Sequence, residues 1–349
     1  MALARGTLLG SRSTATLRAG GKEIDMLNRR TLLASSLMAP LAAPALGQAA
    51  WPNRSVRVIV GFPPGGSLDV MTRIAADQMT QRLGQTFVVE TRSGASGNIG
   101  AEALARATPD GYTIGTVSMH NVVINPMLFT RLPFDAERDF QWISAMWDLP
   151  NVAVVPAATV PARTVQEFIA WARQRPQGIS FGSSGVGTTI HLSGSYFLNR
   201  SGIQSTHVSF RGAAQTIPAM LSGDVQFAVD NLASYMPVIQ EGRIRALAIT
   251  TPERWPTLPD VPTMAEAGLD NFNVSPWHLW AAPVGTPRAV VDRISQEIRA
   301  AFADRALQQR ALSIGARLTG STPEEAAARL QRERPRWAEM VRLSGATPE

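Results

Sequence analysis

A short apolar run, a loop of prolines and glycines and an amphipathic segment follow one another at residues 56–83, and this order constrains the fold most strongly. The run at 56–60 reads VRVIV, which is typical of a strand buried on both faces of a parallel sheet. Residues 67–83 carry apolar side chains at helical spacing and end at Gly84, and residues 87–90 form the next apolar run. This βαβ order predicts an α/β fold with a right-handed crossover.

The same alternation continues along the chain. It predicts further strands at 113–117, 152–155, 179–182, 206–210, 225–229 and 245–250, and further helices at 98–106, 164–175, 189–198, 234–240 and from 286 to about 302. In the helix that runs from 286 to about 302, we expect Thr286 to be the N-cap and Pro287 to be the first helical residue. A last helix begins at Thr322, where Glu325 completes a capping box.

Two α/β lobes are the simplest arrangement of these elements. We place the first lobe at 51–152 plus 276–349 and the second at 153–275, each a mainly parallel sheet flanked by helices. Each lobe has a loop of small residues between a strand and a helix. Ligands of open parallel sheets bind at the carboxyl ends of strands, so both loops are expected at such an edge.

Residues 1–49 read as an export signal that is removed from the mature chain. Arg29 and Arg30 precede an Ala- and Leu-rich run at 32–46, which is too short and too interrupted by proline to span a membrane. The arginine pair is typical of the twin-arginine route, although a general secretory signal can also carry it, and translation could start at Met26. A chain without cysteine has no lipid anchor on that residue, so we expect a soluble periplasmic protein.

Charge and composition exclude several classes of protein. The net charge is +6, but the first 49 residues hold six basic and two acidic side chains, so the remainder carries only +2. Its arginines are scattered among acids, which argues against nucleic-acid binding. The chain has no Cys, and its single Lys is Lys22. The mature part therefore lacks the residues for a Schiff base, a thiolate nucleophile, a thiolate metal site or a phosphate-loop lysine.

The first loop, Phe62-Pro63-Pro64-Gly65-Gly66-Ser67, has the composition of an anion site. Its glycines let the backbone approach a ligand, and the following helix points free N–H groups into the same space. The alternative is a tight turn in which Ser67 caps the helix. Asp69 would repel an anion, so we expect its side chain to face sideways.

The second loop, at residues 182–189, has the glycine spacing of a phosphate loop but Thr188 where lysine is required. It also lacks the second glycine of an esterase elbow, because residue 186 is Val. A cradle of backbone N–H groups and hydroxyls remains, which suits a carboxylate. The alternative is a flexible turn.

Polar side chains after strands add candidates. His120 and His191 are expected to line a cleft, whereas His207 is expected to pack within a strand, and no histidine pair has metal-motif spacing. Asp230, next to Asn231, would bind hydroxyl or amine groups of a ligand or cap the next helix. Arg211 would contact a carboxylate or remain solvated.

Six segments resemble one known family. They are VRVIVGFPPGGSLD at 56–69, GQTFVVETRSGASGNIGAEALARATPDGYTI at 84–114, ISFGSSGVGTTIHLSG at 179–194, VSFRGAAQTIPAMLSGDVQFAVDNL at 208–232, IRALAITTPERWPTLPDVPTMAEAGL at 244–269 and AAPVGTPRAVVDRI at 281–294. In this order they are similar to the Bug, or TctC-type, family of periplasmic solute-binding proteins, the receptors of tripartite tricarboxylate transporters. The sequence departs from the family's common residues at Gly61, Thr91, Ser93 and 209–211, so the ligand of a relative is not transferred.

The resemblance implies a two-lobed periplasmic-binding-protein fold of type II that closes at a hinge on a small organic carboxylate. It implies separate membrane permease subunits as partners, no catalysis and no cofactor, and we expect a monomer. A secreted hydrolase acting on a carboxylated substrate and a sensor for a membrane signalling partner are the alternatives. Taken together, the loops, the strand ends and the resemblance give these candidate ligand contacts: Phe62, Pro64, Gly65, Gly66, Ser67, Asn98, Ser118, His120, Ser183, Ser184, Gly187, Thr188, Thr189, His191, Arg211, Asp230 and Asn231.

Overall fold

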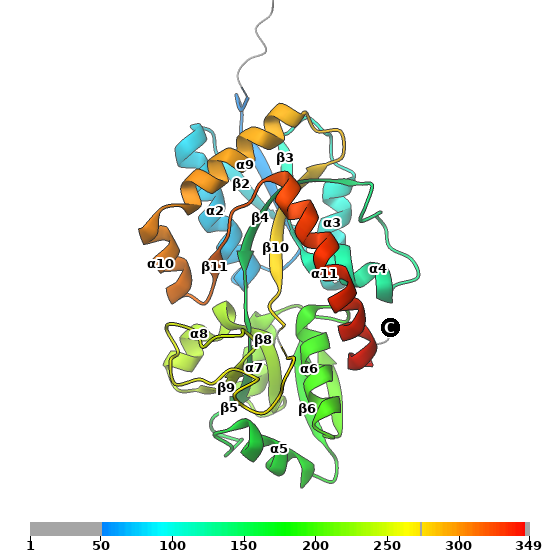
Figure 1. Ribbon diagram of the computed structural model, residues 1–349, viewed down its shortest axis with the longest axis vertical. Helices are drawn as coiled ribbons and strands as arrows, with labels where there is room; N and C mark the ends of the chain where they lie inside the picture. Colours follow the sequence, from blue (N-terminus) through cyan, green and yellow to red (C-terminus); the bar gives the residue numbers. More distant parts are fainter. Residues whose placement is uncertain (1–50, 273, 346–349) are drawn as a thin grey trace, which may run out of the picture. The chain divides into compact units, whose positions relative to one another are not determined.

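Two β-sheets organise the chain in a computed structural model that describes residues 51–272 and 274–345. The first sheet has six strands in the order β11-β4-β10-β3-β1-β2, and the second has five in the order β7-β6-β8-β5-β9 (Figure 1). We call each sheet with its covering helices a lobe. The export signal predicted at 1–49 lies outside the described residues.

The strands are β1 (Val56–Val60), β2 (Phe87–Thr91), β3 (Thr113–Ser118), β4 (Phe140–Asp148), β5 (Asn151–Pro156), β6 (Ile179–Ser183), β7 (Ser205–Ser209), β8 (Phe227–Asn231), β9 (Ile244–Ile249), β10 (Trp277–Pro283) and β11 (Arg317–Leu318). The helices are α2 (Ser67–Leu83), α3 (Asn98–Ala105), α4 (Asn125–Leu128), α5 (Val165–Arg173), α6 (Thr189–Arg200), α7 (Ala213–Leu221), α8 (Leu232–Gln240), α9 (Arg288–Phe302), α10 (Arg305–Ser313) and α11 (Pro323–Ser344).

Most strands of each sheet run in one direction, and two of the exceptions have a common cause. In the first sheet β1 pairs in parallel with β2 and β3, whereas β10 is antiparallel to β3 and β4. In the second sheet β6 pairs in parallel with β7 and β8, whereas β5 is antiparallel to β8 and β9. β5 and β10 are the strands that enter a sheet from the other lobe, so they start at the edge where their neighbours end. The short edge strand β11 is also reversed, since it pairs antiparallel with β4, but it follows α10 of its own lobe. The predicted two-sheet α/β fold is confirmed, with mixed pairing in both sheets.

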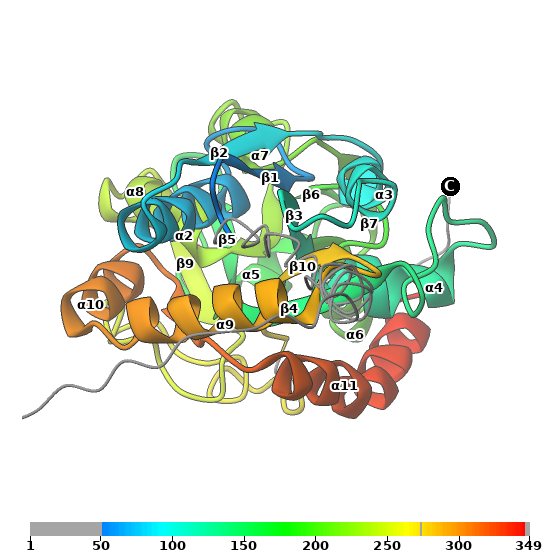
Figure 2. The same ribbon diagram turned by 90° about the horizontal axis from the view of Figure 1, so that it is seen from above.

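Helices cover both faces of the first sheet, with α2 and α9 on one face and α3 and α11 on the other (Figure 2). The α9 helix buries Val291, Ile294 and Ile298, a helical spacing that gives it one apolar side. Each such side chain stabilises the fold by about 1.5–3 kcal/mol when fully buried.

The second sheet is covered in the same way. On one face Phe168 of α5 and Phe197 of α6 stack on Phe227 of β8, each with ring centroids 4.7 Å away. On the other face α7 and α8 bury Met220 and Tyr235. Both faces are therefore apolar, as the sequence predicts for buried strands.

Two chain crossings connect the sheets side by side. The β4–β5 crossing passes through Leu149, whose N–H donates to the Pro276 carbonyl in the β9–β10 crossing (2.9 Å). Thr250 and Asn151 exchange further hydrogen bonds between the same two segments, from Thr250 N–H to the Asn151 carbonyl (2.9 Å) and from Asn151 N–H to Thr250 Oγ1 (3.0 Å). Within residues 51–272 and 274–345, the chain passes from one sheet to the other at these two segments, and α11 follows the last strand of the first sheet.

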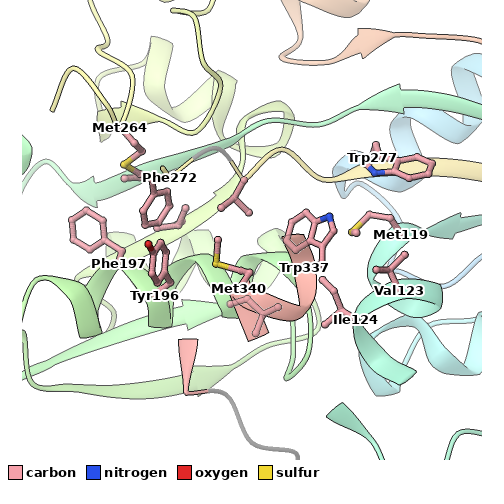
Figure 3. Close-up of a cluster of buried hydrophobic side chains, with 14 of the residues drawn as sticks. Met119, Val123, Ile124, Tyr196, Phe197, Met264, Phe272, Trp277, Trp337 and Met340 are labelled. Carbon is pink, nitrogen blue, oxygen red and sulfur yellow. The ribbon is translucent and has the colours of Figure 1, made fainter. Parts of the chain in front are cut away.

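The α11 helix runs from the first lobe to α6 of the second (Figure 1). In Figure 3, Trp337 lies with Met119 and Val123 of the first lobe, while Met340 lies towards Tyr196 of α6. The hydrophobic core is therefore continuous between the lobes along this helix. The described residues form one compact unit, and the lobe boundaries drawn from the sequence remain a prediction.

One predicted helix start is wrong. The α9 helix begins at Arg288, and Pro287 occupies the N-cap position. Thr286 does not cap it, because its hydroxyl donates to the Pro283 carbonyl instead (2.8 Å). The capping box of Thr322 and Glu325 is confirmed.

Candidate functional site

The carboxyl ends of β1, β3, β6 and β8 meet between the two sheets and surround a small central cavity. Its volume is about 40 Å³, enough for a few water molecules, since one needs roughly 10–15 Å³. Residues from both lobes line it: Phe62, Pro63, Gly66, Ser67, Leu68, Ser118, His120, Ser184, Thr188, Thr189, Ile190, Gly212, Ala213, Ala214, Asp230, Asn231, Ser234 and His278. None of these lining residues is Arg or Lys.

The N-termini of α2, α6, α7 and α8 all border this cavity. The first N–H groups of a helix have no partner inside it, so each terminus presents donors and a partial positive charge. The N-cap residues of α2 and α7 are Gly66 and Gly212, neither of which has a side chain to accept from those N–H groups. These two termini from opposite lobes lack an N-cap side chain and thus favour an anion in the cavity, while the first N–H of α2 donates to Ser234 Oγ (3.1 Å).

Gly212 also has a conformational requirement. Its φ is +151°, which L side chains rarely adopt, while the position a Cβ would take is open apart from Pro63 Cδ at 3.9 Å. The backbone conformation, rather than crowding, therefore favours glycine at the start of α7.

Ser67 does not cap α2, so the first loop is not the tight turn that the sequence offered as the alternative to an anion site. Ser67 is the first helical residue, and its N–H donates to Ser234 Oγ of the other lobe (3.1 Å). Asp69 faces sideways as expected: its carboxylate accepts from Gly65 N–H (3.0 Å) and pairs with Arg73 (2.9 Å). The acid therefore fastens the loop and does not line the cavity.

In the second loop Thr188 caps α6, because its hydroxyl accepts from His191 N–H (3.2 Å). Ser183 Oγ lies 2.7 Å from His207 Nε2, and the His191 ring packs 4.2 Å from that of His207. These three side chains lie beneath the loop, so His191 supports it from below and does not line the central cavity. His207 packs within a strand, as expected.

Direct hydrogen bonds join the lobes around the cavity. Ser67 Oγ donates to Asn231 Oδ1 (3.1 Å), and Asn231 Nδ2 donates to Asn151 Oδ1 at the crossing (2.7 Å). On the other side Ser96 Oγ donates to the Val186 carbonyl (2.8 Å). The first loop, through Ser67, and the second loop, through Val186, therefore each contact the opposite lobe.

Three buried polar atoms at the cavity have no hydrogen-bond partner: Ser118 Oγ, Asp230 Oδ2 and His278 Nδ1. Their residues are only 1–2% exposed. Ser118 and His278 are cross-strand neighbours on β3 and β10, whereas Asp230 faces the cavity from β8. Because buried polar atoms are nearly always paired, these three indicate where a ligand would bind.

Burial changes the charge of the titratable groups in the cavity. It lowers the pKa of His120 to about 4 against the effect of the Ser96 carbonyl, and lowers the pKa of His278 to about 3 with help from nearby His120. Both histidines are therefore neutral at pH 7, and His120 Nε2 donates to Ser96 O (2.9 Å). Burial raises the pKa of Asp230 to about 7, and the Asn231 N–H that donates to its Oδ1 (2.6 Å) limits the rise.

A second opening, the outer groove, lies beside the central cavity. Loops at 93–99, 184–186 and 209–211 line it with Gly61, Phe62, Phe129 and Gln215. Phe62 and Ser184 border both spaces, so they separate the groove from the cavity. Asn98 borders the groove, but its Oδ1 accepts from Asn121 and Asn125 (2.9 and 2.8 Å) and supports the loop.

The structure brings most of the sequence candidates together. The residues that line the central cavity are Phe62, Gly66, Ser67, Ser118, His120, Ser184, Thr188, Thr189, Asp230 and Asn231. Seven others lie outside it: Pro64 and Gly65 on the exposed turn, Asn98 and Arg211 at the outer groove, Ser183 and Gly187 within the second loop, and His191 beneath that loop. Asp230 does not cap α8, because Asn231 occupies the N-cap position.

Sequence reasoning missed His278 and the start of α7. His278 reaches the cavity on β10, whose strand pattern at 277–283 it did not identify. The small residues Gly212, Ala213 and Ala214 after β7 were the available signal for a third helix terminus. Within the described ranges no group of three or more His, Asp or Glu could hold a metal ion, and no helix is long and apolar enough to cross a membrane.

Comparisons with known proteins agree with this geometry. The family model "Tripartite tricarboxylate transporter family receptor" matches residues 71–342. A curated relative from Pseudomonas sp. (strain P51), a UPF0065 protein in the tcbD-tcbE intergenic region, is 35% identical and the match covers 91% of this chain and 95% of that protein.

Three solved structures have the same fold over nearly their whole length. The R. palustris protein Rpa4515, solved with adipate, is 32% identical with a TM-score of 0.82 over 86% of this chain and 100% of that one. The periplasmic binding protein BugD is 31% identical with a TM-score of 0.81 over 86% and 100%. MatC from Rhodopseudomonas palustris, with bound malate, is 28% identical with a TM-score of 0.78 over 83% and 100%.

These matches confirm the resemblance to Bug and TctC-type receptors. Three observations support the same assignment. They are the two-sheet fold with a cavity between the sheets, the family model that spans most of the chain, and the relatives above 30% identity. The chain belongs to the tripartite tricarboxylate transporter receptor family.

Proposed function

We propose that this protein captures a small organic carboxylate, most simply a dicarboxylate, in the central cavity and presents it to separate membrane permease subunits. The observation that carries the proposal is the pair of uncapped helix N-termini at Gly66 and Gly212, which face the cavity from opposite lobes. Relatives that hold adipate and malate support the choice of ligand class.

The backbone, rather than a charged side chain, supplies the attraction for the anion. No lining residue is Arg or Lys, and the two cavity histidines are neutral at pH 7 because burial lowers the pKa of each, His120 to about 4 and His278 to about 3. A carboxylate oxygen accepts well from free N–H groups at a helix start. Binding by such groups selects for an anion of small size and fixed geometry.

Binding requires the lobes to separate. A cavity of about 40 Å³ holds only a few waters, which is less than a dicarboxylate needs. The hydrogen bonds from Ser67 and Ser96 across the cleft must therefore break before the ligand enters. The Ser96 bond lies at the outer groove and forms again when the lobes close, whereas the Ser67 bond crosses the cavity and gives way to the ligand.

We infer binding without chemical conversion. Ser183 Oγ lies 2.7 Å from His207 Nε2, but neither residue lines the cavity, and Ser118 and His278, which do line it, share no hydrogen bond because Ser118 Oγ and His278 Nδ1 have no partner. Export through the arginine-pair signal, a periplasmic location, a monomeric state and the two-lobe boundaries belong to the same proposal.

A thermal-shift panel tests the function. Mono-, di- and tricarboxylates, aromatic acids and amides are each added to the purified protein. A ligand at a hundredfold excess over its Kd should stabilise the fold by about 2.7 kcal/mol, a clear rise in Tm. Dicarboxylates should give the largest shift and amides none. A panel in which no carboxylate raises Tm would rule out this function.

A further inference from the structure

Asp230 occupies an unusual place for an anion site. It is 1% exposed, lines the same cavity as the uncapped termini of α2 and α7, and its Oδ2 has no hydrogen-bond partner. Because Asp230 and the starts of both helices line one small cavity, a carboxylate held at the helix termini lies close to this carboxyl group.

Two carboxylates cannot both stay ionised at close range in a site shielded from water. When they share such a site, one proton remains between them and joins them by a hydrogen bond. A neutral carboxyl group has one O–H donor, which Oδ2 of Asp230 could direct at the ligand.

We propose that Asp230 is protonated when ligand is bound and donates a hydrogen bond from Oδ2 to the ligand carboxylate, so that binding takes up one proton from solvent wherever Asp230 is ionised in the free protein. This rests on the proposed function, since it concerns how the same cavity holds a carboxylate. Asp230 then supplies a hydrogen-bond donor to the anion in a cavity that has no Arg or Lys in its lining.

The surroundings of Asp230 favour the proton on this residue. Burial already brings its pKa to about 7, although Asn231 N–H and the nearby Tyr235 hydroxyl oppose the rise. Tyr235, from α8, is itself held neutral because burial and Asp230 raise its pKa well above 10.

Three histidines near the cavity are neutral at pH 7. His120 and His278 line it from the first lobe with pKa values of about 4 and 3, and His191 lies beneath the second loop with a pKa of about 4, each lowered mainly by burial. Asp69 on α2 is paired with Arg73 and turned away.

Calorimetric titration of adipate and malate between pH 6.5 and 8.5 tests the inference. In this range both ligands are ionised, since carboxylic acids titrate near pH 4. If only the protonated form of Asp230 binds, with a free pKa of about 7, the Kd should be about 25-fold weaker at pH 8.5 than at pH 6.5. Titrations at pH 8 in buffers of different ionisation enthalpy should show uptake of about one proton.

The variant Asp230→Asn keeps the shape and places a permanent donor where the proton would be. It should bind the same ligand with a Kd that no longer changes with pH, and with no proton uptake. Asp148→Asn is the matched control, because Asp148 is a half-buried carboxyl group whose pKa is also raised by burial but which lies outside the cavity. This control should keep the 25-fold pH dependence.

Each remaining outcome is decisive. A wild-type Kd that is constant with pH, a proton uptake that persists in Asp230→Asn, or an affinity that rises with pH would overturn the inference while leaving carboxylate binding intact. The last result would mean that ionised Asp230 accepts from a hydroxyl or ammonium group of the ligand. If adipate, malate and the wider carboxylate panel all fail to bind at every pH, the proposed function itself fails.

Discussion

The hydrogen bond from Ser96 to the Val186 carbonyl predicts how fast ligand leaves the site. Ser96 lies in the loop at 93–99 of the first lobe, and Val186 lies in the second loop of the other lobe, with 2.8 Å between Oγ and O. The bond crosses the cleft and does not involve the central cavity. Ser96→Ala should therefore weaken the closed state without removing a contact to the ligand.

The size of the effect follows from this single bond. A hydrogen bond inside a protein contributes about 0.5–1.5 kcal/mol net, and Ser96 is half-buried, so about 1 kcal/mol is a fair upper value. Since the ligand leaves only from the open state, the dissociation rate should rise by up to about fivefold. The Ser96 carbonyl keeps its bonds from His120 and Asn121, so the loop itself should stay folded.

Stopped-flow displacement of the carboxylate identified by the panel measures this rate. Ser93→Ala is the control, because Ser93 is an exposed serine that borders the same groove. Without ligand, amide hydrogen exchange in the second loop should also become faster in Ser96→Ala. An unchanged dissociation rate, or an equal rise in the Ser93 variant, would refute the argument that this contact holds the lobes together.

Three further predictions concern the site and the fold. Gly66→Val should abolish carboxylate binding in the thermal-shift assay while changing the free energy of unfolding by less than about 1 kcal/mol, because a Cβ there has only the Pro63 carbonyl within contact at 3.5 Å and φ is −74°. Trp337→Ala, at 1% exposure on α11, should cost about 3–5 kcal/mol in urea unfolding, whereas the exposed Leu343→Ala on the same helix should cost far less. Burial lowers the pKa of His278 to about 3, so the folded state keeps this histidine neutral while the unfolded state binds a proton below pH 6.5. The free energy of unfolding should therefore fall as the pH is lowered from 6.5 towards 3. His278→Gln should reduce this loss of stability, and an acid unfolding curve equal to that of the wild type would contradict the prediction.

Local sequence was sufficient for most elements near the site. The strand at 56–60, the loop of prolines and glycines and the helix at 67–83 lie where the pattern predicts them. Periodicity and glycine positions act over a few residues, so they can be read without the rest of the chain. The anion preference of the first loop follows from the same local chemistry.

The partners of those elements depend on contacts that are distant in sequence. His278 comes beside Ser118 only because β10 returns from the second lobe and pairs with β3, and Ser67 meets Asn231 and Ser234 more than 160 residues further along the chain. Sequence spacing carries no signal for such pairs. His191 is the opposite case: its position at a helix start favoured the cleft, but packing against His207 and Phe181 turned it beneath the loop.

The sequence by itself determined the fold class, the two loops of small residues at helix starts, and the absence of Cys and of any Lys besides Lys22, since each depends on residue type and short-range order. The tertiary structure alone decided that Gly66 and Gly212 line one cavity from opposite lobes, and that Asp230 is buried at the same cavity with its Oδ2 unpartnered. A pKa depends on burial and on neighbours in space, so the raised pKa of that carboxyl exists only once both sheets have packed around it.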